Sequence, residues 1–312
     1  MKLSYAFSLF ALSSTLIYGE ELEQEFLSQS TSSSFDVDLP IVEFVPQTKS
    51  PAIAVTLSAI LPGLGHTYLG EYGMAGALMG STGVGIGLSQ FSFFEPYLAG
   101  DLLALSAVSS YGIYSAYRDA RNFNGRENYS YKMPQDSFGD LAWAPFRWAV
   151  LKKPEVWGGI LGSLVVGSVL SQLAFPNGIE EHIHMAPQNL HPAYAFPVSI
   201  GEETLFRGFL QSAISETTSP AVGIALSSVA FGLMHIPNAS ELAPDEQRRY
   251  YTFIVPYLSA AGAYFGWLTY KNQSLQESVA VHAWYDFAIF LSSSIAQSAA
   301  IGEPRFDFSF SF

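Results

Sequence analysis

The stretch Gly201-Glu202-Glu203-Thr204-Leu205-Phe206-Arg207-Gly208-Phe209-Leu210-Gln211 places two adjacent carboxylates and an arginine inside an otherwise apolar segment. A charged side chain within a membrane helix costs at least about 2.5 kcal/mol on insertion scales, so three charges this close together point to a function rather than to packing. On an α-helix Glu203 and Arg207 lie one turn apart and can form an ion pair. Glu202 lies about 100° round the helix from Glu203, which leaves it the freer carboxylate. The stretch therefore predicts a helix that carries a reaction.

The composition favours a polytopic membrane protein. Of the 312 residues, 49% are hydrophobic and only 13% are charged, and the mean hydropathy is +0.23. Because apolar runs of spanning length recur between residues 52 and 299, we expect an all-α transmembrane helical bundle with about seven spans in a lipid bilayer. A net charge of −13 argues against a nucleic-acid partner, and without cysteine there is no thiolate nucleophile and no Cys-ligated metal.

The first 50 residues predict two segments outside the bundle. Residues 1–19 have a basic start and an apolar run, which is typical of a signal peptide; an uncleaved membrane anchor is the alternative. Residues 20–50 are Ser-rich and acidic, so we expect an extracytoplasmic acidic linker. These features favour a location in the bacterial inner (plasma) membrane.

Residues 51–121 are predicted to form an N-terminal membrane region, with spans at 52–68, 73–92 and 101–117. Its first span contains Pro62-Gly63-Leu64-Gly65-His66-Thr67-Tyr68-Leu69-Gly70, where proline and glycines predict a half-helix and a turn. This element resembles the Pro-Gly-x-Gly-Gln-x-Tyr-x-Gly element of small bacterial membrane domains, with His66 in place of Gln.

Residues 122–154 belong to the longest polar interval of the chain. Half of the 14 basic side chains lie between Arg118 and Lys153, so the positive-inside rule predicts a basic cytoplasmic loop. Residues 155–298 follow as a second membrane domain, and residues 299–312 are expected to be a C-terminal tail. The expected spans of the second domain are 156–175, 198–215, 221–235, 250–270 and 276–298.

Three segments of residues 155–298 carry polar groups at helical spacing. They are Glu202-Glu203-x-x-x-Arg207, Phe231-x-x-x-His235 and His282-x-x-x-Asp286. Each polar group in a membrane needs a polar neighbour, so we expect these side chains to converge.

The three motifs, in this order on successive helices, resemble the CPBP intramembrane protease family, which includes the CAAX prenyl endopeptidases and the bacterial Abi-type relatives. The resemblance covers about residues 155–298. It implies an intramembrane endopeptidase, a hydrolase that acts on a membrane-associated protein or peptide substrate. Asp286 stands where many relatives have Asn, and an ionised Asp cannot donate a hydrogen bond.

These residues permit peptide-bond hydrolysis. Glu202 is the candidate base that deprotonates the attacking water. His235 would orient that water, while His282 and Asp286 would support the oxyanion of the tetrahedral intermediate. The resemblance implies the same roles for the matching positions. The predicted catalytic set is Glu202, Glu203, Arg207, His235, His282 and Asp286.

Other hypotheses use the same residues. Glu202, His235 and His282 could bind Zn²⁺ with water as fourth ligand, so the site either requires no cofactor or holds zinc. Against zinc, no His-Glu-x-x-His sequence is present. A non-catalytic immunity or scaffold protein would keep the cluster for helix packing, and a transporter would use its carboxylates as a proton relay.

The chain order raises a difficulty for a common site. Glu202 lies early in its helix and His235 late in the next, which puts both on one side of the membrane. His282 follows soon after a helix start on the other side, if 250–270 crosses fully. The groups meet only near mid-membrane or if one segment is re-entrant.

Overall fold

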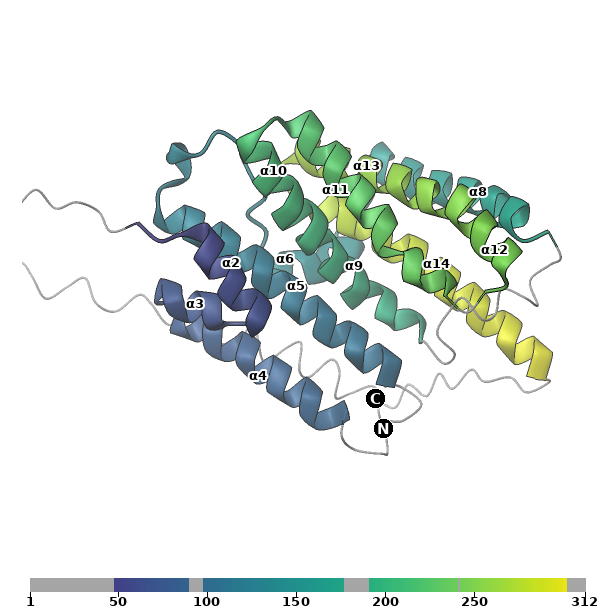
Figure 1. The fold of residues 1–312 in the computed structure, drawn as a ribbon, viewed down its shortest axis with the longest axis horizontal. Helices are drawn as coiled ribbons and strands as arrows, with labels where there is room; N and C mark the ends of the chain where they lie inside the picture. Colours follow the sequence, from purple (N-terminus) through teal and green to yellow (C-terminus); the bar gives the residue numbers. More distant parts are fainter. Residues whose placement is uncertain (1–47, 90–97, 177–190, 241, 302–312) are drawn as a thin grey trace, which may run out of the picture.

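The computed structural model describes residues 48–89, 98–176, 191–240 and 242–301, and within these ranges the chain forms helices and no strands (Figure 1). The predicted all-α class is confirmed for this part of the chain. The predicted signal peptide 1–19, most of the linker 20–50 and most of the tail 299–312 lie outside the described residues.

The helices after the linker begin with a short helical hairpin. α2 (Pro51–Ile60) has 10 residues, and α3 (Leu64–Leu69) follows the turn that the proline and glycines predicted. Gly63 adopts φ +98°, and a Cβ there would lie 2.6 Å from the Ala75 carbonyl oxygen. The Ser50 amide donates to the Tyr68 hydroxyl at 3.0 Å, so the chain returns to the end at which it entered. A helix of this length is about 15 Å long, too short to cross a bilayer.

α4 (Tyr72–Ser89) and α5 (Leu98–Phe123) complete the N-terminal bundle. α5 runs beyond the predicted span end at residue 117, and Arg118 and Arg121, expected in the polar interval, are buried on it. Pairing makes this burial tolerable. Arg118 contacts Asp119 at 2.7 Å, and Arg121 contacts Glu216 at 3.2 Å.

The interval predicted as a loop is a folded segment. It contains η3 (Arg126–Asn128), α6 (Phe138–Trp143), η4 (Ala144–Phe146) and α7 (Trp148–Leu151). Its end packs against the last helix, where the Trp284 indole donates to the Pro145 carbonyl at 2.8 Å. The segment is therefore part of the core packing of the second half.

The described residues of the second half are helical. The helices are α8 (Pro154–Ala174), α9 (Ala195–Glu203) after the short η6 (Pro192–Tyr194), the π-helical η7 (Thr204–Leu210), α10 (Gln211–Thr217), α11 (Pro220–Met234), η8 (Ile236–Ala239), α12 (Pro244–Arg249), the π-helical η9 (Tyr250–Ile254), α13 (Val255–Asn272) and α14 (Gln276–Ile301). α9, η7 and α10 form one continuous helix, as do α12, η9 and α13. In Figure 1 the N-terminal helices lie at one end of the molecule, and α5 packs against α9.

Two helical stretches of the described part, 154–174 and 220–239, are long and apolar enough to cross a membrane. Their outward faces are apolar. Val165 on α8 is 65% exposed and Leu226 on α11 is 52% exposed. Exposed apolar stripes of this kind favour contact with lipid over contact with water.

The structure shows that two predicted locations, the extracytoplasmic linker 20–50 and the cytoplasmic loop 122–154, are incompatible. Lys49, at the end of the predicted extracytoplasmic linker, exchanges two hydrogen bonds of 2.8 Å with Asn124, in the predicted cytoplasmic loop. Residues this close lie at the same membrane face. The sides assigned to 20–50 and to 122–154 therefore cannot both be right.

Candidate functional site

Glu203 lies at the centre of the predicted site. It is completely buried at the end of α9, and its Oε1 accepts a hydrogen bond from Arg207 Nη1 at 3.0 Å. The same oxygen lies 2.9 Å from His282 Nδ1. Because an ionised carboxylate only accepts, His282 Nδ1 is the donor of that hydrogen bond. The expected Glu203–Arg207 pair is present, and Glu203 also orients an imidazole from a distant helix.

Arg207 is surrounded by aromatic rings. It lies fully buried in the π-helical η7, a geometry that often marks functional sites. Its guanidinium carbon is 4.3 Å from the Phe231 ring centre and 5.3 Å from that of Phe265, close enough for cation–π attraction. A Cβ at Gly262 would lie 2.8 Å from Arg207 Nη2. Glycine at this position therefore leaves room for the guanidinium.

Glu202 has a different environment from Glu203. Its side chain is 31% exposed, and its Oε2 lies 3.7 Å from His282 Nε2, beyond hydrogen-bond distance. That oxygen is itself buried and has no hydrogen-bond partner in the protein. Glu202 thus combines a partly exposed side chain with a buried oxygen that has no partner.

His282 is held from three directions. Besides the Glu203 contact, its Nε2 lies 3.3 Å from Asp286 Oδ2, one turn further along α14. Its ring stacks on Phe265 with centres 5.2 Å apart and an interplanar angle of 21°. We refer to Glu202, Glu203, Arg207, His282 and Asp286, which are in mutual contact, as the Glu203 cluster.

His235 adjoins this cluster through an aromatic ring. Its Nδ1 lies 2.8 Å from the Phe231 carbonyl oxygen, so Nδ1 donates and Nε2 keeps a lone pair when the ring is neutral. The Phe231 ring centre is 4.9 Å from that of His235 and 5.8 Å from that of His282. All six predicted residues therefore lie in one region.

The start of α14 accounts for the meeting of His282 and Glu202. Asp136 caps this helix from the 124–153 segment, because its Oδ2 accepts from the Leu275 amide at 2.8 Å. Its Oδ1 accepts from the Ser274 hydroxyl at 2.8 Å and from the Gln276 side-chain amide at 2.9 Å. Leu275 is fully buried, so α14 begins inside the fold. This buried start brings His282 to the level of Glu202.

Asp136 is a residue that the sequence analysis did not find. It lies 139 positions before Leu275, and no local pattern connects the two. The capping box of Ser137 with Asp140 marks only the start of α6. A contact between such distant residues becomes visible only in the folded chain.

The predicted zinc ligands do not form a compact set. Within the described residues, the ligand atoms of His66, Glu71 and Asp119 all lie within 4.8 Å of one another, and Glu202, His235 and His282 form no such group. The contact of His282 Nδ1 with Glu203 leaves Nε2 as the nitrogen that could bind a metal. Zinc dependence stays an untested prediction.

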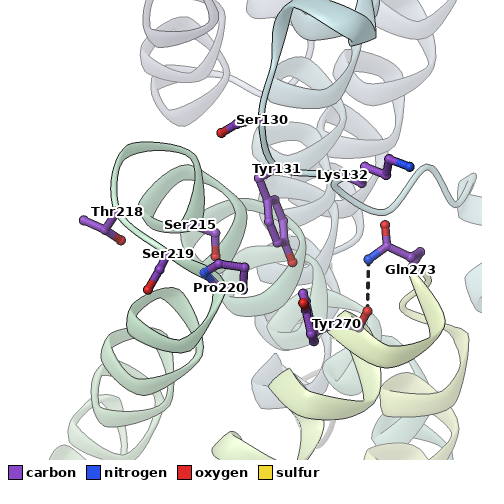
Figure 2. A pocket seen from close by; sticks show the side chains of 9 residues that line it. All are labelled: Ser130, Tyr131, Lys132, Ser215, Thr218, Ser219, Pro220, Tyr270 and Gln273. Atoms are coloured by element: carbon purple, nitrogen blue, oxygen red, sulfur yellow. Dashed lines mark hydrogen bonds between the residues drawn. The ribbon is translucent and has the colours of Figure 1, made fainter.

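A polar pocket lies away from the cluster. It has a volume of about 380 Å³ and is lined by residues 130–132, by the α10–α11 turn and by the end of α13 (Figure 2). Tyr131 and Tyr270 face each other across it, and the Gln273 side chain donates to the Tyr270 carbonyl at 3.0 Å. None of the six predicted catalytic residues lines this pocket.

Residues 190–288 match a family model described as type II CAAX prenyl endopeptidase Rce1-like. Neither a search of curated proteins nor one of solved structures found a match to the chain. The matched segment begins shortly before α9 and ends just after Asp286, so it contains all three motifs. The match confirms, for this segment of the chain, the resemblance to the CPBP family that the order of the motifs predicted.

Proposed function

We propose that this protein is an intramembrane endopeptidase in which Glu202 activates the attacking water. One contrast carries the proposal. Glu203 accepts from Arg207 and faces His282, whereas its neighbour Glu202 keeps a buried oxygen without a partner, 3.7 Å from His282 Nε2. Glu203 therefore positions Arg207 and His282, whereas Glu202 is available to bind a small polar molecule such as water.

The chemistry requires one water and no further reactant. Glu202 takes a proton from the water while the oxygen attacks the carbonyl carbon of the peptide bond. His235 Nε2 accepts the other water hydrogen and so orients the nucleophile. His282 acts as an imidazolium beside Asp286, so that Nδ1 donates to Glu203 while Nε2 donates to the oxyanion that forms. Glu202 then passes its proton to the leaving amine as the carbon–nitrogen bond breaks.

The bilayer is part of the proposal. We infer that α4, α5, α8, α11, α13, α14 and the continuous α9–α10 helix cross the membrane, which agrees with the expected number of about seven spans. The α2–α3 pair would enter and leave on one side. The substrate would be a membrane-associated protein or peptide, and the location the bacterial inner membrane.

The test is proteolysis in liposomes that contain the full-length protein. Quenched fluorescent peptides with a transmembrane anchor serve as substrates, each made with and without a prenyl group. We expect Glu202→Gln to lower the cleavage rate by at least about 100-fold, because a positioned base contributes about 10²–10⁴. Glu127→Gln, at an exposed carboxylate in η3, is the matched control and should cleave normally. Undiminished cleavage by Glu202→Gln would refute the assignment of the base.

The non-catalytic hypothesis makes the opposite prediction. If the cluster only supports packing, Glu202→Ala and His235→Ala should lower stability but leave the cellular function of the remaining protein intact. Comparing cleavage per folded molecule, with the folded fraction taken from size-exclusion chromatography, separates the two hypotheses.

A further inference from the structure

A second group of ionisable side chains lies in the N-terminal bundle, outside the family match. His66 is on α3, Glu71 is in the turn before α4, and Asp119 is near the end of α5. One ligand atom from each lies within 4.8 Å of the other two. Together with Arg118, which pairs with Asp119, we refer to these residues as the His66 cluster.

His66 is the unusual member of this cluster. Its side chain is completely buried, and neither ring nitrogen has a hydrogen-bond partner in the protein. Asp119 Oδ2 lies 3.6 Å from Nε2, which is too far for a hydrogen bond. Burying an imidazole with both nitrogens unpaired is unfavourable. A bound ligand at His66 would remove this cost, because the protein itself supplies no hydrogen-bond partner.

The backbone holds two of these residues in place. Gly70 has φ +92°, a conformation that glycine adopts without strain. With this turn, the Glu71 amide donates to the His66 carbonyl at 2.9 Å. Positions 66 and 71 are thereby fixed next to each other.

Asp119 is fixed from the opposite side. Arg118 donates to its Oδ1 at 2.7 Å and to its Oδ2 at 3.0 Å. Each carboxylate oxygen has a second lone pair, so the guanidinium does not use up its acceptor capacity. Asp119 is therefore positioned before any ion binds.

We propose that His66, Glu71 and Asp119 bind a divalent transition-metal ion through one imidazole nitrogen and one oxygen from each carboxylate. An imidazole with two carboxylates suits Zn²⁺ and its neighbours, whereas Mg²⁺ and Ca²⁺ prefer sites made only of oxygen. Two carboxylates against one guanidinium leave the cluster negative when His66 is neutral, which favours a cation. Glu71 is exposed, so water can reach the ion and complete its coordination.

The position of the site indicates a structural role. The ion would tie the α2–α3 hairpin to α5. Arg118, which holds Asp119, also donates to the Asp136 carbonyl at 2.7 Å, and the Asp136 side chain caps α14. A metal in the His66 cluster would thus support the segment that positions the last helix.

Metal binding by the purified full-length protein tests the proposal. The protein is stripped with EDTA and dialysed against Zn²⁺, Co²⁺ or Mg²⁺, and bound metal is measured by mass spectrometry. We expect one Zn²⁺ or Co²⁺ per chain and no retained Mg²⁺. His66→Gln and Glu71→Gln should each weaken Zn²⁺ binding by about tenfold or more. Because Glu71 is exposed, its variant should fold even if His66→Gln does not.

Controls distinguish this site from the Glu203 cluster. Glu202→Gln and His235→Gln should retain Zn²⁺, as should Glu127→Gln, an exposed carboxylate near the end of α5. Loss of zinc in the first two variants, with normal binding by Glu71→Gln, would overturn the proposal. It would also be overturned if the unmodified protein bound neither Zn²⁺ nor Co²⁺ at micromolar concentration. Binding is measured without substrate, so the outcome is independent of peptidase activity.

Discussion

The Glu203 cluster and the His66 cluster both combine a buried arginine, a carboxylate and a histidine, but they share the carboxylate differently. In the first, Glu203 Oε1 is within 3.0 Å of Arg207 and within 2.9 Å of His282. In the second, Arg118 engages both oxygens of Asp119, and His66 is left at 3.6 Å. His282, held by carboxylates, is the histidine that we propose acts on the substrate. His66, which has no hydrogen-bond partner in the protein, is the one that we propose binds a metal ion.

The two arginines, Arg118 and Arg207, also differ in how many hydrogen bonds they donate. Every nitrogen of Arg118 donates a hydrogen bond, including one to a backbone carbonyl. Arg207 donates from Nη1 to Glu203, while its Nε and Nη2 have no protein partner and lie among aromatic rings. Arg207 therefore depends on one hydrogen-bond partner, Glu203, whereas Arg118 has both Asp119 and the Asp136 carbonyl.

The largest expected effect follows from this dependence. Glu203→Gln leaves Arg207 buried without a counter-charge, which should cost about 3–5 kcal/mol of unfolding free energy and abolish cleavage. Asp119→Asn should cost less, about 1–3 kcal/mol, because Arg118 keeps its bond to the Asp136 carbonyl. Denaturation in detergent measures both. An equal or larger loss for Asp119→Asn would break the contrast between the two arginines.

A smaller effect is expected where backbone packing makes room for Arg207. A Cβ at Gly262 would lie 2.8 Å from Arg207 Nη2 and 3.2 Å from Ser228 Cα. Gly262→Ala should therefore cost about 1–3 kcal/mol by overpacking and should slow cleavage. Gly158→Ala on α8 is the control, since no atom lies within 4 Å of the added methyl group. Equal thermal stability of the two variants would show that the α11–α13 contact has room to spare.

Asp136 connects the two regions, and its substitution measures how much the first supports the second. Asp136→Asn removes one of the two acceptor oxygens at the start of α14, at a cost of about 0.5–2 kcal/mol. Because His282 lies two turns further on, we expect kcat to fall with little change in KM. Asp245→Asn, exposed on α12, should change neither. An unaltered kcat for Asp136→Asn would show that the cap at the start of α14 does not affect catalysis.

The smallest effect concerns pH. Burial alone would raise the pKa of the Asp140 carboxyl on α6, but hydrogen bonds from the Ser137 hydroxyl and amide and from Arg147 outweigh it and hold the pKa below its usual range. A carboxylate whose pKa is lower in the folded state stabilises the fold above the unfolded pKa. That stabilisation should be lost as pH falls below about 4. Asp140→Asn should flatten this part of the melting-temperature profile, and an unchanged slope would contradict the assignment.

Local patterns were enough to predict several parts of the site. The spacing of Glu203 and Arg207 follows from the helical repeat, and Pro62 with its glycines predicted the break between α2 and α3. The order of the three motifs predicted the family resemblance that the match of residues 190–288 supports, although no contact between the motifs was known. Helical periodicity and backbone preferences depend on neighbouring residues, so the sequence expresses them directly.

The partners of the buried charges were decided only by the tertiary structure. Nothing near Glu203 in the sequence indicates that His282 will share its oxygen, or that Asp136 will cap α14. His66 and Asp119 are likewise 53 positions apart, since one lies at 66 and the other at 119. A buried charge must find a counter-charge or a hydrogen bond, but the requirement does not name the partner. The packing of whole helices chooses it, because side chains distant in sequence become neighbours only when the helices have taken their places.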